Sequence, residues 1–266
     1  MENVVSRDLA PLALIDTQPI NIATQTDVLG RISARMKAGL GFTLFTLNMD
    51  HLVKRRGDEK FRAAYDRATF VTADGAPIVA LARRQGAKLE RTTGADMVWP
   101  VCELAARDGI PVYFFGSSKE SLDAASVELK AKYPSLDIRG MESPPMGFDP
   151  SSKEADAYGQ RIVASGAKLC FVLLGAPKQE LFSDRMWMRY PRLGFLCVGA
   201  AVDFISGQQK RAPVLMQKLN LEWAWRLMTN PGRLAMRYAK CAALLTDLAM
   251  PKLRAPRIGS TTLQGS

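Results

Sequence analysis

An uninterrupted apolar run, Phe171–Leu174, ends abruptly at Gly175. Such a run is typical of a strand that is buried on both faces of a parallel sheet. Pro177 can then start a helix. The first turn of that helix would carry three polar residues with long side chains: Lys178, Gln179 and Glu180. Because ligands bind at the carboxyl ends of strands in open α/β sheets, the segment predicts one wall of a crevice. An ordinary strand–loop–helix joint would explain the same pattern.

The same alternation of strand and helix runs through most of the chain. Strands are expected at Phe42–Leu47, Ala68–Thr72, Pro111–Gly116, Leu136–Gly140, Lys168–Gly175 and Leu193–Val198. Helices are expected near Thr26–Ala38, at Asp50–Tyr65, Gly94–Arg107, Ser118–Tyr133 and Lys153–Ser165, and between the last two strands. Strands that alternate with helices of this length predict βαβ units. The fold class is therefore α/β, with a Rossmann-like, mostly parallel sheet flanked by helices.

The carboxyl-terminal part of the chain is far more basic than the rest. From Lys210 onward there are ten cations and two acids, so this part carries +8 of the net charge of +10. Such an imbalance predicts an anionic partner, whether nucleic acid, anionic lipid or a phosphorylated substrate. We expect an α/β catalytic domain at residues 1–209, a basic helical appendage at 210–250, and a disordered tail at 251–266.

One helix of the appendage should begin at Asn230-Pro231, an N-cap followed by proline. Apolar residues then fall on one stripe: Leu234, Tyr238, Cys241, Leu245 and Leu248. Cations flank this stripe at Arg233, Arg237 and Lys240. A basic amphipathic helix of this kind is typical of a membrane interface. A helical hairpin packed on the main domain, or in the interface of a homo-oligomer, fits the pattern equally well.

Several classes of protein are disfavoured by what the sequence lacks. The amino terminus has no apolar segment typical of a signal peptide. The longest apolar run, Leu193–Val202, is shorter than the ~20 residues that span a bilayer. Four widely spaced cysteines indicate reduced core thiols in a cytosolic protein. His51 is the single histidine, which argues against a histidine-rich metal site and favours a carboxylate as general base. Nucleotide-binding glycine fingerprints and a D-x-D pair are absent.

Polar residues follow three of the expected strands. Strand ends on one edge of a parallel sheet converge, so these residues could line one crevice: Thr46, Asn48, Asp74 and Gln179. Asp74 is the best candidate for a general base, since burial beside neutral amides would raise its pKa. Asp74 could instead cap a helix that starts near Pro77, because Asp-Gly is a common turn. Gly116 and Ser117 precede another helix, whose free amides suit a diphosphate.

These motifs, taken in order, resemble the WecG/TagA/CpsF glycosyltransferases (glycosyltransferase family 26), bacterial enzymes of surface-polysaccharide assembly. The resemblance covers roughly Asn21–Tyr238. It rests on Thr46-x-Asn48, Ala73-Asp74-Gly75, Arg91-x-x-Gly94-x-Asp96, Gly175-x-Pro177-Lys178-Gln179-Glu180, Gly199-x-x-x-Asp203, Lys210-Arg211-Ala212-Pro213 and Leu221-Glu222-Trp223-x-x-Arg226.

The resemblance implies an inverting, metal-independent transfer from a UDP-sugar to a polyprenyl-diphosphate-linked saccharide, with no cofactor. It implies that Asp74 is the catalytic base. Implied substrate-binding residues are Thr46, Asn48, Arg91, Lys178, Gln179 and Glu180. Implied nucleotide- or diphosphate-binding residues are Gly116, Ser117, Gly175, Asp203, Arg226, Arg233 and Arg237. The resemblance also implies a cytoplasmic enzyme that sits peripherally on the inner face of the cell membrane through its appendage.

The alternative from another class is a non-catalytic α/β module that binds nucleotides or nucleic acid through its basic tail. Against a nucleic-acid partner, the cations of the appendage flank an apolar stripe, and the aromatic residues are not spread as a stacking platform. The donor sugar is left open among N-acetylmannosamine, its uronic acid and glucose, since one or two contacts in a pocket could decide among them.

Overall fold

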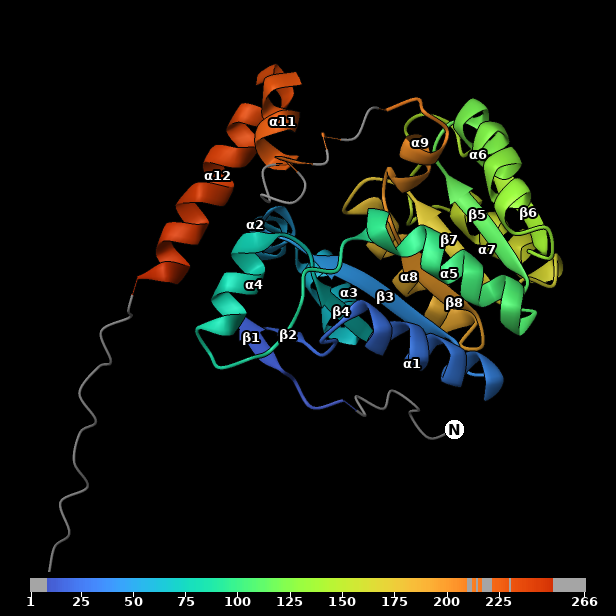
Figure 1. The fold of residues 1–266 in the computed structure, drawn as a ribbon, viewed down its shortest axis with the longest axis horizontal. Helices are drawn as coiled ribbons and strands as arrows, with labels where there is room; N and C mark the ends of the chain where they lie inside the picture. The colour runs from blue at the N-terminus through green and yellow to red at the C-terminus, as the bar shows by residue number, and fades with distance from the viewer. Residues whose placement is uncertain (1–8, 210–211, 214, 217–221, 230, 251–266) are drawn as a thin grey trace, which may run out of the picture.

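The computed structural model describes residues 9–209, 212–213, 215–216, 222–229 and 231–250. Its centre is a six-stranded sheet in the order β4-β3-β8-β7-β5-β6, with every neighbouring pair parallel (Figure 1). These strands are β3 (Phe42–Leu47), β4 (Phe70–Ala73), β5 (Val112–Gly116), β6 (Ile138–Glu142), β7 (Leu169–Leu173) and β8 (Gly194–Cys197). A separate antiparallel pair is formed by β1 (Ala13–Ile15) and β2 (Gln18–Ile20). The Rossmann-like α/β prediction is confirmed.

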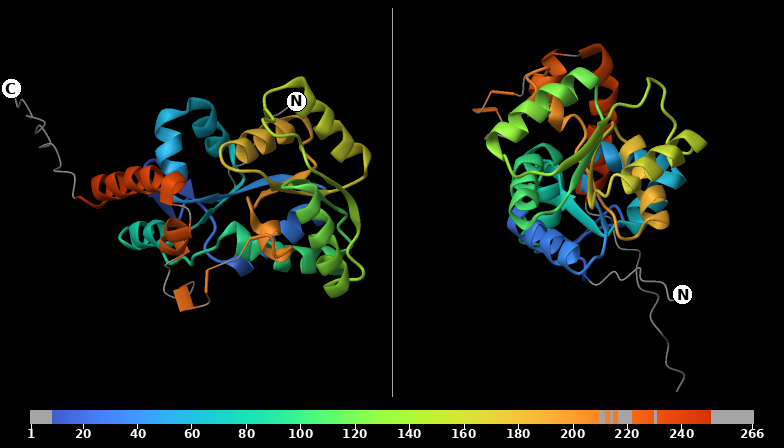
Figure 2. Two further views of the ribbon diagram at one scale, coloured as in Figure 1. Left: turned by 90° about the horizontal axis from the view of Figure 1, so that it is seen from above. Right: turned by 90° about the vertical axis from the view of Figure 1, so that its right-hand side faces the viewer.

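Helices cover both faces of the sheet, as Figure 2 shows from two further directions. One apolar cluster includes side chains of α2 (Met49–Gly57), α3 (Glu59–Arg67), α4 (Ala76–Arg83), α7 (Lys153–Ala164) and α8 (Lys178–Arg189). The other includes side chains of α1 (Gln25–Lys37), α5 (Gly94–Asp108), α6 (Lys119–Lys132) and α9 (Ala201–Ile205). Within β3, Phe45 and Leu47 enter the first cluster while Phe42 and Leu44 enter the second. Alternate side chains point to opposite faces, so burial on both faces requires the continuous apolar runs seen in the sequence.

The helix expected at Asp50–Tyr65 is wrong as a single element, because α2 ends at Gly57 and α3 starts at Glu59. Asp58 separates them in an extended conformation (φ −129°, ψ 107°). Its side chain accepts a hydrogen bond from Phe61 N at 3.0 Å, which caps α3. Aspartate is a preferred N-cap residue, and here the cap overrides the apparent continuity of the helical pattern. The break lets α2 and α3 each bury a separate face.

The appendage contains α11 (Glu222–Thr229) and α12 (Pro231–Ala249); α12 lies against α2 and α4, and α11 packs on α12 (Figure 1). Leu234, Cys241 and Leu244 of α12 are buried, and Leu245 and Leu248 pack against the core. The predicted apolar stripe is therefore largely used in packing on the main domain, the hairpin alternative. Asn230, the predicted N-cap, and the tail 251–266 lie outside the described residues.

Ion pairs also hold the appendage against the domain. Arg237 Nε lies 2.9 Å from Asp50 Oδ1 on α2. Arg56 Nη2 lies 2.9 Å from Asp247 Oδ2 of α12 and also pairs with Asp16 through Nε. These groups are partly exposed, so each pair adds little stability by itself. Their effect is to fix the register of α12 on α2.

Two further expectations concern the cysteines and the membrane. Cys102, Cys170, Cys197 and Cys241 are all free and buried, which confirms that they are core thiols. Within the described ranges, no helix has both the length and the apolar character needed to cross a bilayer.

Candidate functional site

The carboxyl ends of β3 and β4 bring the first two sequence motifs together. The register pairs Thr46 with Thr72 and Leu47 with Ala73. The ladder continues one residue further, since Asp74 N donates to Leu47 O at 2.8 Å. Asn48 and Asp74 therefore leave neighbouring strands at the same level of the sheet. Both are half-buried, so both side chains have access to solvent at this edge.

The sequence left open whether Asp74 caps the helix that follows β4. Gly75, at φ +100°, occupies the N-cap position of α4, and Pro77 follows in its first turn. The N-cap residue of α4 is therefore Gly75 and not Asp74, and a role of Asp74 as general base stays a prediction. The pKa of Tyr65 is raised well above its usual value, first by burial and then by the charges of Glu180, Cys197 and Asp74. The charge of Asp74 is therefore near enough to affect this buried phenol. Asp74 thus lies close to a buried polar cluster beneath the edge.

Asn48 and Thr46 each accept a hydrogen bond from a buried residue beneath this edge of the sheet, His51 and Tyr65 respectively. Asn48 is the N-cap of α2, and its Oδ1 accepts from His51 N at 3.1 Å. This leaves the Asn48 amide group with donors for a substrate hydroxyl. Thr46 is buried (4% exposed), and its carbonyl oxygen accepts from Tyr65 Oη at 3.4 Å. Direct contact of Thr46 or Asn48 with a substrate stays a prediction.

Gln179 and Glu180 occupy the first turn of α8, as predicted, but both side chains are buried. Gly199 N donates to Gln179 Oε1 at 2.9 Å, and Gln179 Nε2 donates to Glu180 Oε1 at 2.8 Å. The Gln179 amide therefore ties the loop after β8 to Glu180. A role for Gln179 in positioning a sugar stays a prediction and would use its remaining donor and lone pair.

Glu180 is 0% exposed, so in this structure it supports the site from within and does not line it. The expectation that the Glu180 side chain is exposed in the crevice and contacts the substrate is therefore corrected. Lys178 is half-buried, and in the part of the chain that the structure describes it makes no ion pair. Gly175 is exposed, and its carbonyl oxygen accepts from Lys178 N at 2.9 Å. Lys178 is thus the member of this segment best placed to reach a ligand.

Burial shifts the pKa of two groups in the cluster in opposite directions. It lowers the pKa of His51 to about 3, aided by the charge of Lys54, so the imidazole is neutral at pH 7. It raises the pKa of Glu180 to about 7, against the hydrogen bond from Gln179. Both shifts follow from the cost of placing a charge in a low-dielectric interior. Glu180 was expected on this helical turn but not in a buried position, and His51 was assigned no role in the site.

Arg91 lies at the same edge, since Thr92 N donates to Ala73 O at 2.8 Å beside Asp74. Its guanidinium Nη1 lies 3.2 Å from Glu222 Oε2 of α11, and Nη2 lies 3.9 Å from Asp96 Oδ2. Arg91 thus joins the edge of the sheet to the appendage. A diphosphate at Arg91 would share the guanidinium with Glu222 or displace it. Binding of a diphosphate by Arg91 stays a prediction.

Of the three appendage arginines that were predicted to bind diphosphate, the structure describes the side chain of Arg237. Arg237 pairs with Asp50 of α2, and its side chain is 44% exposed. The structure therefore gives Arg237 a docking contact, and a diphosphate contact stays a prediction. The side chains of Arg226 and Arg233 lie outside what the structure describes.

Gly116, Ser117 and Asp203 form a second group, at the end of β5. Ser117 Oγ donates to Asp203 Oδ1 at 2.5 Å, and Gln209 Nε2 donates to Asp203 Oδ2 at 2.9 Å. A carboxylate cannot hold a diphosphate without a cation, but it suits a ribose hydroxyl. The structure thus brings Asp203 and Ser117 together, and the binding of a nucleotide or diphosphate by either residue stays a prediction.

The backbone at Gly116 tolerates no side chain. Its φ is +117°, and a Cβ there would lie 2.6 Å from the carbonyl carbon of Leu173 on β7. We expect Gly116→Ala to lower the free energy of unfolding by about 2–4 kcal/mol, through backbone strain and displacement of β7. Urea unfolding would measure it.

Gly30→Ala is the matched control, because the α1 position has open space around its Cβ. That change should be neutral or stabilise the protein by up to about 1 kcal/mol, since alanine favours helix. Equal free energies of unfolding for the two variants would contradict the proposed strain at Gly116.

A cavity of about 310 Å³ lies elsewhere, with Asn21, Arg67 and Thr69 among the residues that line it. Thr69 precedes the first residue of β4, whereas Asp74 follows its last, so this cavity is not the crevice predicted at Asp74. Within the described ranges, no group of three histidine, cysteine or acidic residues could hold a metal ion.

Sequence reasoning missed Tyr65 and gave His51 no role. Tyr65 was treated only as the end of a helix, and His51 was noted as the single histidine and as part of the polar segment after the first strand. Tyr65 Oη and His51 Nδ1 are 2.7 Å apart, although 14 residues separate them. Their contact depends on the break at Asp58, for which helical periodicity gave no signal.

A family model described as the glycosyl transferase WecG/TagA/CpsF family matches residues 14–257.

Proposed function

Because the chain belongs to the WecG/TagA/CpsF family of glycosyltransferases, we propose that it transfers a hexose or N-acetylhexosamine unit, including uronic acid forms, from a UDP-sugar to a polyprenyl-diphosphate-linked saccharide. The transfer inverts the anomeric centre and needs no metal. The observation that carries this proposal is the meeting of Asp74, Asn48 and Arg91 at one edge of the sheet. The product would enter a bacterial exopolysaccharide or another surface polysaccharide.

In this mechanism Asp74 accepts the proton of an acceptor hydroxyl. The hydroxyl oxygen attacks the anomeric carbon, the bond from that carbon to the UDP oxygen breaks, and UDP leaves with its electron pair. A single displacement of this kind inverts the centre and requires one carboxylate base within ~3 Å of the hydroxyl. Arg91 would neutralise charge that develops on the leaving diphosphate.

We further propose that the appendage holds the enzyme peripherally on the inner face of the cell membrane. The packed stripe of α12 cannot provide the contact, because it faces the domain. The appendage also carries exposed apolar side chains: Leu215, Trp223, Met228, Met236 and Met250. Together with the net positive charge of this region, they suit an interface of anionic lipid.

The test is a panel of UDP-sugars with a synthetic polyprenyl-diphosphate-saccharide acceptor and a mass readout. We expect one donor class to extend the acceptor by one sugar in the presence of a metal chelator. No extension with any donor, combined with a shift of labelled oligonucleotides, would instead favour the nucleic-acid-binding alternative. Flotation with anionic vesicles, compared with neutral ones, tests the membrane contact separately.

A further inference from the structure

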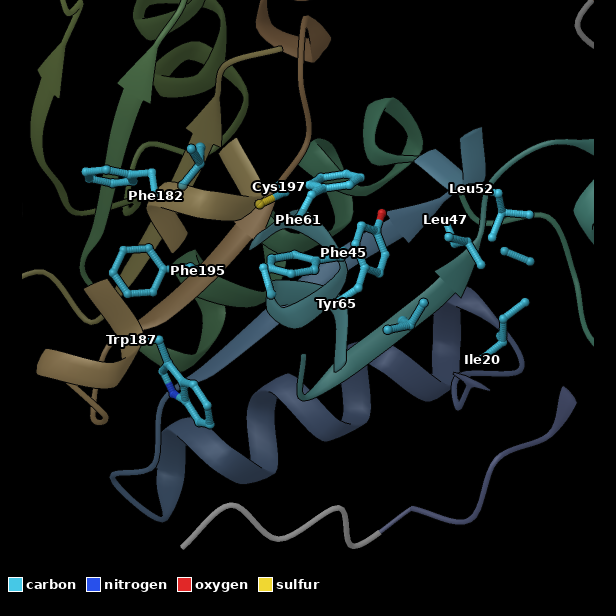
Figure 3. Packing of buried hydrophobic residues seen from close by; sticks show 14 of the residues in the cluster. Ile20, Phe45, Leu47, Leu52, Phe61, Tyr65, Phe182, Trp187, Phe195 and Cys197 are labelled. Atoms are coloured by element: carbon cyan, nitrogen blue, oxygen red, sulfur yellow. The ribbon is translucent and has the colours of Figure 1, made fainter. Parts of the chain in front are cut away.

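Three buried side chains lie directly beneath the candidate site, each on a different helix. Tyr65 of α3, His51 of α2 and Glu180 of α8 are 1%, 5% and 0% exposed. Tyr65 Oη lies 2.7 Å from His51 Nδ1, and His51 Nε2 lies 4.0 Å from Glu180 Oε1. Figure 3 shows Tyr65 next to Phe45 and Phe61, and both aromatic pairs have ring centroids 5.1 Å apart. The surrounding aromatic side chains fix the phenol in one orientation.

Each of these three residues makes a hydrogen bond to a different residue of the candidate site, Tyr65 and Glu180 through their side chains and His51 through its backbone N–H. Tyr65 Oη bonds the Thr46 carbonyl, His51 N bonds the Asn48 side chain, and Glu180 Oε1 accepts from Gln179 Nε2. A backbone N–H can only donate, so the Gln179 atom facing Gly199 N must be Oε1. The Gln179 amide is therefore held in one orientation, with Nε2 toward Glu180. One cluster thus contacts all three polar positions.

We propose that Tyr65, His51 and Glu180 act as one positioning unit beneath the site, here named the supporting triad. It would hold three residues in their working geometry: Thr46, Asn48 and Gln179. This inference rests on the proposed sugar transfer, in which these three residues meet the substrate. Misplacement of such groups by about 1 Å can cost on the order of 10²-fold in rate. The triad itself would touch no substrate.

The ionisation of Glu180 would set how firmly Gln179 is held. A hydrogen bond to a carboxylate is roughly twice as strong as one to a neutral carboxylic acid. Glu180 Oε2 is buried without a hydrogen-bond partner among the described residues, a placement that favours the protonated acid at low pH. The ionisable groups that face the triad lie on several elements: Asp50 and Lys54 of α2, Asp74 after β4, Cys197 of β8, Arg55 of α2 and Arg237 of α12.

The first test compares the pH dependence of kcat for wild type and Glu180→Gln. Glutamine has the same shape but cannot ionise, so it fixes the weaker bond to Gln179. We expect kcat at pH 8 to fall about tenfold, with a donor KM that changes less than about twofold. The rise of wild-type kcat across pH 7 should disappear in the variant. Glu128→Gln, on the exposed face of α6, is the matched control and should keep the wild-type profile.

A Glu180→Gln enzyme whose kcat still rises across pH 7, or whose kcat at pH 8 stays within twofold of wild type, would overturn the proposal. Tyr65→Phe should lower kcat in the same direction, because it releases both His51 and the Thr46 carbonyl. Its pH profile should keep the step near pH 7, since Glu180 remains. Loss of that step in Tyr65→Phe would also contradict separate roles within the triad.

The second test needs no substrate and uses the free energy of unfolding against pH. Glu180 has a raised pKa, so its stabilising effect is present below pH 4.5 and is lost as pH rises to about 7. His51 has a lowered pKa, so its effect is present above pH 6.5 and is lost as pH falls toward 3. Between pH 4.5 and 6.5 the two slopes oppose each other in the wild type.

In Glu180→Gln, only the contribution of His51 to the slope of the free energy of unfolding against pH should therefore remain. Relative to wild type, its unfolding constant should rise by up to about tenfold per pH unit as pH falls from 6.5 to 4.5. His51→Gln should show the opposite trend over the same range. If the free energy of unfolding had the same pH dependence in wild type, Glu180→Gln and His51→Gln, the proposal that Glu180 and His51 are coupled in the triad would be overturned. If no UDP-sugar is transferred, the proposed function fails while this measurement still decides whether the triad exists.

Discussion

Replacing Asp74 with asparagine should lower the rate of sugar transfer by about 10²- to 10⁴-fold, the usual contribution of a general base. Asparagine keeps the size and hydrogen-bonding oxygen of the side chain but cannot take a proton from the acceptor hydroxyl. The backbone N–H of residue 74 would still bond Leu47 O, so the edge of the sheet should be unchanged. Initial rates with the donor identified by the UDP-sugar panel would measure the effect.

The same experiment needs proof that the variant still folds and binds its donor. Calorimetry should give a dissociation constant for the UDP-sugar within about threefold of wild type, and the far-ultraviolet circular dichroism spectrum should be the same. Asp123→Asn is the matched control, because this carboxylate lies on the exposed surface of α6. Transfer by Asp74→Asn within threefold of wild type would remove Asp74 from the role of base.

Truncation after Gln209 should give the second-largest loss, with transfer to a lipid-linked acceptor falling by about 10²-fold or more. The truncation removes Glu222, which is one partner of Arg91, and Arg237, which is one partner of Asp50. It also uncovers the apolar surface on which Cys241, Leu244 and Leu245 pack. The same assay with a detergent-solubilised acceptor would measure the loss, with circular dichroism to show that the α/β domain stays folded.

Truncation after Met250 is the control for the appendage, because it removes only residues 251–266. We expect it to keep wild-type transfer. Full transfer by the protein that ends at Gln209 would refute an essential appendage. A loss that vanishes when the lipid is replaced by a short soluble acceptor would show that the appendage serves acceptor capture and not the chemical step.

Much of the fold could be predicted because burial on both faces leaves a direct record in the sequence. The strand Phe42–Leu47 was predicted with its observed bounds, and the helices at α1, α5, α6 and α7 within one or two residues at each end. The single helix at Asp50–Tyr65 failed because an N-cap bond at Asp58, local to three residues, decided the break. A periodic pattern averages over such a site and does not detect it.

The candidate site was predictable to the extent that it depends on strand ends. Asn48 and Asp74 lie at one edge because parallel strands all point the same way. Arg91 was expected there only from the family resemblance, and it reaches the edge through the segment before α5. The burial of Gln179 and Glu180 was not predictable, since three consecutive polar residues on a first helical turn are usually solvated. Their burial depends on which face of α8 meets the sheet. The packing of the α12 stripe on the main domain likewise depends on tertiary contacts with α2 and α4.

The sequence by itself determined the layered α/β architecture, the edge of the sheet that carries the polar motifs, and membership of a glycosyltransferase family. These follow from the periodicity of apolar residues and the order of the motifs, both of which can be recognised in short stretches of sequence. Only the tertiary structure decided that Glu180, His51 and Tyr65 share one buried space, and that Arg91 reaches Glu222 of the appendage. Contacts between distant segments depend on how helices pack and where they end, so no local pattern encodes them.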